Sequence, residues 1–124
     1  MEEPPNSAKI SFLKGVSQLK EQTGAIFNEQ TLPALKPIKD ILITSEFKRA
    51  YGTNELEGVV RVRIRVTKDS GHMKIFWFSL RDGKWIVTRW AMEPWERDRP
   101  PKVSITNEET KQFVEKVQSC FNLP

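Results

Sequence analysis

Three segments within residues Val59–Ala91 alternate two kinds of side chain, one residue at a time. A period of two is the spacing at which the side chains of a β-strand point to opposite faces, so each segment predicts a half-buried strand. In the first segment aliphatic residues alternate with arginines: Val60, Arg61, Val62, Arg63, Ile64, Arg65 and Val66. A sheet built this way has one apolar face and one face that is both basic and aromatic.

The other two predicted strands, Met73–Leu80 and Lys84–Ala91, are joined by the pair Asp82-Gly83. An Asp-Gly pair between apolar runs is a strong hairpin signal, because a type I′ turn needs a positive φ at both central residues. A two-residue turn fixes which residues lie opposite one another. It predicts three cross-strand pairs: Leu80 with Trp85, Phe78 with Val87, and Trp77 with Thr88.

The loop between the first two strands decides which face receives the arginines. A three-residue loop, Asp69-Ser70-Gly71 with Gly71 left-handed, places the arginines beside Trp77 and Trp90. A four-residue loop would instead set them against Phe76 and Phe78, where unpaired charge is costly to bury. We therefore expect the three-residue loop and a face that combines arginine with tryptophan.

A helical arm is expected over residues 7–52, after a flexible N-terminus at 1–6. Its first part, Ala8–Asn28, has an apolar stripe with helical spacing. The stripe consists of Phe12, Val16, Leu19, Thr23 and Ile26. This helix could pack on the sheet or pair with a second copy in a dimer. After two prolines, Ile38–Ile43 is expected to be a short helix or an extended piece, and Ser45–Tyr51 a further turn closed by Gly52.

The last third is expected to be irregular at Glu93–Lys102, because prolines do not fit a central strand. Val103–Ile105 could form a brief fourth strand. A capping box at Thr106–Glu109 then starts an amphipathic helix over residues 107–121. The prediction is a single α+β domain, residues 1–124, with a sheet of three to four antiparallel strands at 58–106. If both helices cover the apolar face, the basic face stays open.

Composition excludes several functional classes. The 124 residues include one cysteine and one histidine, which rules out a disulfide framework and a Cys-rich metal site. His72 lies beside a predicted turn and Cys120 in a predicted helix, with no partner that would activate either of them. We expect a non-enzymatic protein without cofactor or metal. Without a signal peptide or an apolar run of ~18 residues, we expect no membrane association and a nuclear or cytoplasmic location.

The basic face favours nucleic acid as the partner. The net charge is +4, and single strands bind where cations follow the phosphates and aromatic rings stack on bases. The candidate nucleic-acid-binding residues are Arg61, Arg63, Arg65, Lys74, Trp77, Lys84, Arg89 and Trp90. The same face could equally serve as a protein interface, including that of a homodimer.

Part of the chain resembles a known family. The resemblance runs from His72-Met73-Lys74 through Trp77–Lys84 and Pro101–Ile105 into the helix from Thr106. These residues are similar to the core of the positive cofactor four family, transcriptional coactivators that bind single-stranded DNA as dimers. The resemblance implies strands followed by one helix, and a function in transcription or in DNA or RNA maintenance. The arm through Gly52 has no counterpart in that family.

A second pattern implies another fold. Asp82–Val87 resembles the Asp-Gly-x-Trp hairpin of cone-shaped domains of the nuclear transport factor two or cystatin-like type. In such domains helices precede a curved sheet whose concave face forms a pocket or a groove for a partner. This resemblance implies a protein-interaction or assembly module.

Overall fold

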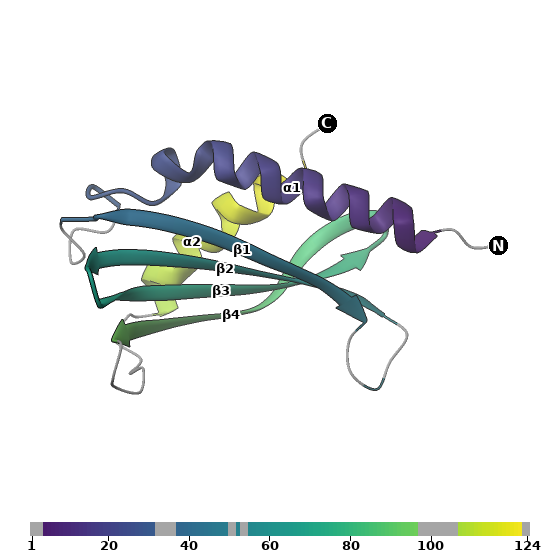
Figure 1. Cartoon of the computed structure of the whole chain (residues 1–124). Coiled ribbons are helices and arrows are strands. Elements are labelled where there is room, and N and C mark those ends of the chain that lie inside the picture. Colours follow the sequence, from purple (N-terminus) through teal and green to yellow (C-terminus); the bar gives the residue numbers. More distant parts are fainter. Residues whose placement is uncertain (1–3, 32–36, 50–51, 53–54, 97–106, 123–124) are drawn as a thin grey trace.

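The fold consists of a four-stranded antiparallel sheet with both helices on one of its faces (Figure 1). It is seen in a computed structural model that describes residues 4–31, 37–49, 52, 55–96 and 107–122. The elements are α1 (Pro4–Ile26), β1 (Asp40–Arg49), β2 (Leu56–Thr67), β3 (Ser70–Arg81), β4 (Lys84–Glu96) and α2 (Asn107–Phe121). The strands lie side by side in chain order. The α+β class is therefore confirmed.

Helix α1 forms where the apolar stripe predicted it. Phe12, Val16, Leu19 and Ile26 are all buried against the sheet and α2. The helix begins at Pro4 rather than Ala8, which is compatible with proline because the first helical turn needs no N–H donors. Thr23 at the edge of the stripe donates its hydroxyl to the carbonyl of Leu19, at 3.0 Å.

Strand β1 corrects the prediction of a helical arm over residues 7–52. From Asp40 to Arg49 the chain is extended and pairs with β2 along its whole length, from Asp40 opposite Arg65 to Arg49 opposite Leu56. Ile43 is buried while Leu42 is exposed, so the run of three apolar residues at its start obscured the alternation. The turn expected at Ser45–Tyr51 is strand as far as Arg49, and Gly52 has φ +77°.

The hairpin between β3 and β4 begins as predicted. Asp82 and Gly83 have φ angles of 52° and 77°, and Leu80 lies opposite Trp85 and Phe78 opposite Val87. A bulge at Thr88 then shifts the pairing, so that Trp77 lies opposite Arg89. The predicted pair of Trp77 with Thr88 is wrong, because one extra residue in β4 offsets every later pair.

The hairpin between β2 and β3 has a shorter loop than predicted. Thr67 pairs with Ser70, so only Lys68 and Asp69 form the turn, and a bulge lies between Arg65 and Thr67. The loop Asp69-Ser70-Gly71 is therefore wrong. A two-residue turn alone would place the arginines on the face opposite to that of Trp77. The extra residue of the bulge reverses this, so the arginines still share a face with Trp77. Gly71 is needed for space rather than for a left-handed backbone, since a Cβ there would lie 1.9 Å from the Ile64 carbonyl oxygen.

An aromatic cluster joins the two layers. The ring of Phe12 lies 5.2 Å from Trp85 and 5.4 Å from Phe121, centroid to centroid. It lies directly over Gly58 of β2, where an added Cβ would be 2.1 Å from the ring. Gly15 likewise leaves room for Phe121, where an added Cβ would be 2.0 Å away. Two glycines, one on the strand and one on the helix, therefore allow the close approach of the layers.

Helix α2 covers β4 and matches its predicted bounds. Its side chains also bind the outer edge of the strand. Asn122 accepts a hydrogen bond from the Trp85 N–H and donates to the Trp85 carbonyl, at 3.1 and 2.9 Å, and Gln118 accepts from the Val87 N–H at 2.9 Å. β4 runs on to Glu96, through a segment that was expected to be irregular. Pro94 fits because β4 is an edge strand. Val103–Ile105 lies outside the described residues.

Candidate nucleic-acid interface

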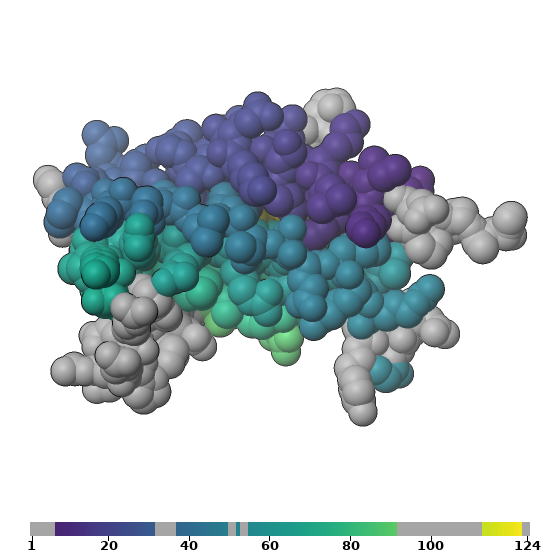
Figure 2. Space-filling view, in the orientation of Figure 1, coloured from purple at the N-terminus to yellow at the C-terminus, as the bar shows by residue number. Residues whose placement is uncertain are grey.

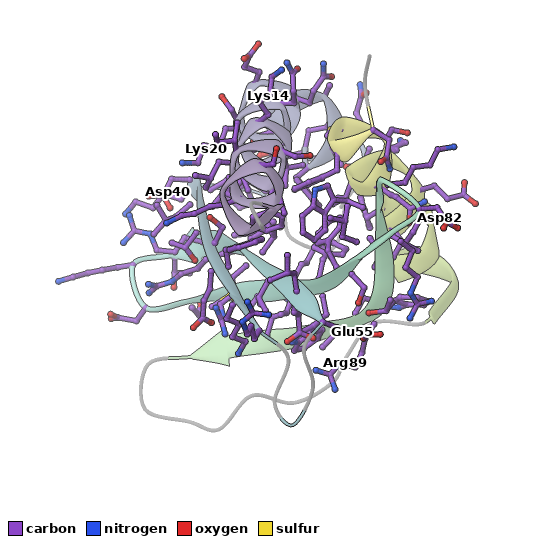
Figure 3. All side chains as sticks on the ribbon, turned by 90° about the vertical axis from the view of Figure 1, so that its right-hand side faces the viewer. Lys14, Lys20, Asp40, Glu55, Asp82 and Arg89 are labelled. Carbon is purple, nitrogen blue, oxygen red and sulfur yellow. The ribbon has the colours of Figure 1, made fainter. Side chains whose placement is uncertain are left out.

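The sheet face that points away from both helices carries the candidate site. We call it the open face and define it by register and alternation. Its described members are Asp40, Leu42, Thr44, Glu46 and Lys48 on β1, Glu57, Val59, Arg61, Arg63 and Arg65 on β2, Gly71, Met73, Ile75, Trp77, Ser79 and Arg81 on β3, and Lys84, Ile86, Arg89 and Ala91 on β4. Val59, between Glu46 and Trp77, is buried. Seen along the sheet in Figure 3, the helices lie above it and Arg89 points below. The helices thus leave this face uncovered.

The three arginines of β2 form a row in the middle of the open face. Each is partly buried at its stem, and each lies opposite a residue of β1: Arg61 opposite Thr44, Arg63 opposite Leu42 and Arg65 opposite Asp40. Successive arginines are two residues apart, so their Cα atoms are spaced along the strand by about 6.5 Å. This spacing is close to the distance between successive phosphates of an extended single strand.

Carboxylates of β1 bind two of these arginines. The Nε of Arg65 donates to both carboxylate oxygens of Asp40, at 3.0 and 3.1 Å, and its Nη2 also contacts Asp40. The hydrogen bond from Arg65 holds the pKa of Asp40 below its usual value, and the same bond raises the pKa of Arg65. Arg61 lies 3.8 Å from Glu46. Exposed pairs of this kind contribute little stability, so another anion can replace the carboxylate.

Trp77 and Arg89 form the aromatic part of the open face. The bulge at Thr88 brings Arg89 opposite Trp77, and the Arg89 Cζ lies 4.2 Å from the centre of the indole ring. The Thr88 hydroxyl donates to the Trp77 carbonyl at 3.3 Å. The attraction between the cation and the ring holds the two side chains together.

Two of the candidate residues lie on the helix side of the sheet. Lys74 is on the helix side of β3, with 0% of its surface exposed, and its ammonium lies 4.6 Å from the centre of the Phe113 ring. Trp90 lies opposite Phe76 and so belongs by register to the helix side. Lys84 is exposed and belongs by register to the open face, at the turn, opposite Arg81. Lys74 and Trp90 are therefore removed from the candidate site.

The contribution of β1 to the open face was not predicted. Asp40, Leu42 and Glu46 belong to the open face because β1 extends the sheet beside β2. A hollow of about 420 Å³ lies there, lined by Asp40, Ile41, Leu42, Arg63 and Arg65. A signal for this strand is present in the sequence, in Ile41, Ile43 and Phe47. They are two and four residues apart, and residues at even spacings share one face of a strand.

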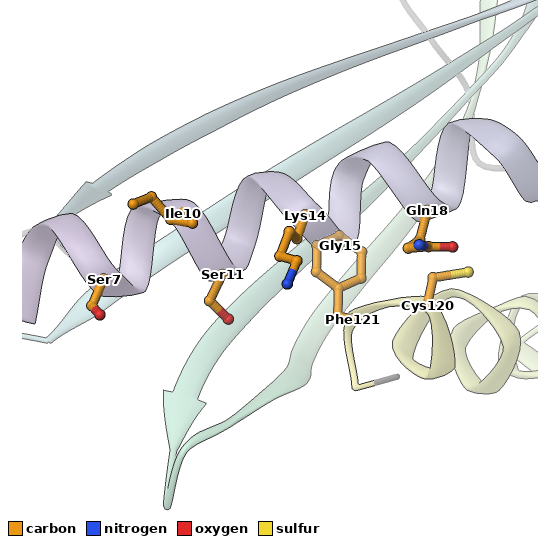
Figure 4. A pocket seen from close by; sticks show the side chains of 8 residues that line it. All are labelled: Ser7, Ile10, Ser11, Lys14, Gly15, Gln18, Cys120 and Phe121. Carbon is orange, nitrogen blue, oxygen red and sulfur yellow. The ribbon is translucent and has the colours of Figure 1, made fainter. Parts of the chain in front are cut away.

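A second hollow, of about 290 Å³, lies between α1 and α2 (Figure 4). Ser7, Ser11 and Lys14 face Cys120 and Phe121 across it. The Cys120 thiol donates to the Lys116 carbonyl at 3.5 Å, and burial raises its pKa. A protonated thiol is a poor nucleophile. Within the described residues, no group of three or more metal-ligating side chains is present.

Comparison of the chain with family models, with curated proteins and with solved structures gives no match in any of the three. The resemblance to the positive cofactor four family therefore stays a prediction from the sequence. Neither α1 nor α2, as far as they are described, combines the length and apolarity that a bilayer crossing requires.

Proposed function

We propose that the chain is a non-catalytic binding module whose open face binds single-stranded nucleic acid. The observation that carries the proposal is the row Arg61, Arg63 and Arg65 beside Trp77 on a face that neither helix covers. The arginines would bind phosphates, and Trp77 would stack on a base in exchange for Arg89. An extended strand suits this surface better than a duplex, because α2, the helix that would have to enter a groove, is packed on β4.

The contacts between the arginines and phosphates would make binding sensitive to salt. Phosphates must displace Asp40 from Arg65 and Glu46 from Arg61, while Arg63 lies between them on the row. If about three phosphates are neutralised, the logarithm of the affinity should fall with the logarithm of the salt concentration with a slope of about −2. A partner bound mainly by apolar contacts would show almost no slope.

The test measures the anisotropy of a fluorescein-labelled oligothymidine, titrated with the protein at several salt concentrations. We expect Arg63→Ala combined with Trp77→Ala to weaken binding by roughly tenfold or more, since each stacked base contributes ~1–3 kcal/mol. The matched control is Lys9→Ala combined with Lys20→Ala, which removes charge from α1 on the other side of the sheet. Circular dichroism confirms that each variant is folded. Unchanged binding in the Arg63/Trp77 variant would show that the open face is not the site.

An acidic protein segment is the second candidate. Arg65 and Arg61 already bind carboxylates in the structure, and a glutamate-rich peptide could take the places of Asp40 and Glu46. Binding of such a peptide would depend on charge but not on stacking against Trp77. Retained binding of a fluorescent glutamate-rich peptide by Trp77→Leu, with loss of the oligonucleotide, would distinguish the two ligands on one surface.

A further inference from the structure

The two edges of the sheet differ in how they are covered. On β4, Gln118 of α2 and Asn122, which follows the helix, bind the outward backbone groups of Val87 and Trp85. Within the described residues, the structure shows no comparable side-chain cap on the outer edge of β1. Figure 2 shows the residues of β1, in blue, along the near face of the molecule below α1. Among the residues that the structure describes, one edge is therefore capped by side chains and the other is not.

Strand β1 carries four charged residues toward its two ends, but it lacks the short length, the bulge and the proline by which many edge strands avoid pairing. It pairs with β2 over all ten of its residues without a register shift, and it contains no proline or glycine. The segment from Ile41 to Ser45 has no charged side chain. Leu42 in this segment is 54% exposed. A long, regular edge with an uncharged central segment is a template for a further strand.

The charges of β1 indicate which strand fits it. Asp40 lies near one end of β1 and Lys48 near the other, both on the open face. A second copy of β1 can pair antiparallel with the first about a two-fold axis at Thr44. In this register Asp40 of each copy lies opposite Lys48 of the other copy. Residues directly opposite in an antiparallel pair share a face, so both ion pairs lie on the open face. A shift by two residues would set Asp40 opposite Glu46 or remove the Asp40–Lys48 pair altogether.

We propose that a second copy of this chain docks on the edge of β1 in this register, forming a symmetric dimer. The two sheets become one continuous sheet, with all helices on one side and the open faces joined on the other. The proposal extends beyond the binding function and does not depend on it, because no nucleic acid is involved in the contact. An extended segment of another protein is the competing occupant of the same edge.

The experiment uses the full chain in sedimentation equilibrium over roughly 1 μM to 1 mM, the range of moderate protein affinities. We expect a monomer–dimer equilibrium for the unmodified protein. Asp40→Lys alone and Lys48→Asp alone each set like charges opposite one another twice, and should weaken the dimer by roughly tenfold or more. An equimolar mixture of these two variants restores both opposite-charge pairs and should dimerise again. Thr44→Lys sets two lysines together at the axis and should also give monomers.

The matched control is Thr88→Lys, which adds the same charge to an exposed threonine of β4 and should leave the dimer unchanged. Circular dichroism checks that every variant is folded. An unmodified chain that is monomeric at the highest concentration would overturn the proposal, leaving the edge for another protein. A dimer that persists in both Asp40→Lys and Thr44→Lys would also overturn it, because the contact would then lie elsewhere.

Discussion

His72 and Lys74 are polar side chains on the apolar face of the sheet. Lys74 packs beneath Phe113, where its ammonium interacts with the ring. The Nδ1 of His72 is buried and forms no hydrogen bond within the described residues. Burial lowers the pKa of His72, and the charge of Lys74 lowers it further. The folded state therefore favours a neutral imidazole.

This environment predicts a loss of stability in mild acid. The pKa of His72 is near 6.5 in the unfolded chain and lower in the folded one. Above pH 6.5 both states are neutral, so the free energy of unfolding is unaffected by this group. As the pH falls below 6.5, the unfolded chain binds a proton first and gains stability relative to the folded chain.

Urea unfolding at about pH 7.5 and about pH 5.5 tests this, because carboxylates titrate mostly below that interval. The midpoint should be lower at the acidic pH in the unmodified protein. Since His72 is the only histidine, His72→Gln should give nearly equal midpoints. The same pH dependence in both proteins would rule out His72 as its source.

The sequence predicted most of the elements but not all of their pairings. α1, α2 and the strands β2, β3 and β4 follow from hydrophobic period, because each buries one face. β1 escaped prediction because its exposed Leu42 interrupts the alternation and because two prolines precede it. The bulge at Thr88 was also not predictable from the pattern, since one added residue leaves the composition of β4 unchanged. Because of this added residue, Arg89 lies on the open face, the face on which Trp90 was predicted.

Packing between the helices can be tested at Gly15 and Gly24, both within α1. Gly24→Ala meets no atom within 4 Å and should stabilise the protein by up to about 1 kcal/mol through helix propensity. Gly15→Ala gains the same propensity but must displace the Phe121 ring seen against it in Figure 4. Overpacking typically costs ~1–3 kcal/mol, so the net effect should be destabilising. Chemical denaturation measures both, and a stabilised Gly15→Ala would contradict the close contact.

The whole molecule is asymmetric in two directions. One face of the sheet is covered by both helices and the other by neither, and within the described part of the chain the edge of β4 is capped by side chains while that of β1 is not. Capping of a single edge limits edge-to-edge association to a closed pair, because each copy has one strand to offer. Uncapping β4 would give each copy two such strands.

Gln118→Ala combined with Asn122→Ala therefore should change the assembly as well as the stability. The loss of hydrogen bonds to buried backbone groups should cost ~1–3 kcal/mol in the free energy of unfolding. With both edges open, species larger than those of the unmodified chain should appear in light scattering as concentration rises. Ser119→Ala is the control, since this hydroxyl bonds only to the Glu115 carbonyl of its own helix, at 3.1 Å. An unchanged size distribution in the double variant would show that α2 does not protect the edge.

The contact of Phe12 with Gly58 also limits how far the helix can slide. Moving α1 by one turn shifts it by about 5.4 Å, close to the two-residue repeat of a strand. The ring would then lie over Leu56 or Val60 instead of Gly58, and a branched side chain would occupy its place. Since β2 offers only one vacant position on this side, α1 has one alignment with the sheet rather than several of similar energy. The absence of a side chain at Gly58 thus selects one position of α1 along the sheet. Hydrophobic burial alone would allow several such positions.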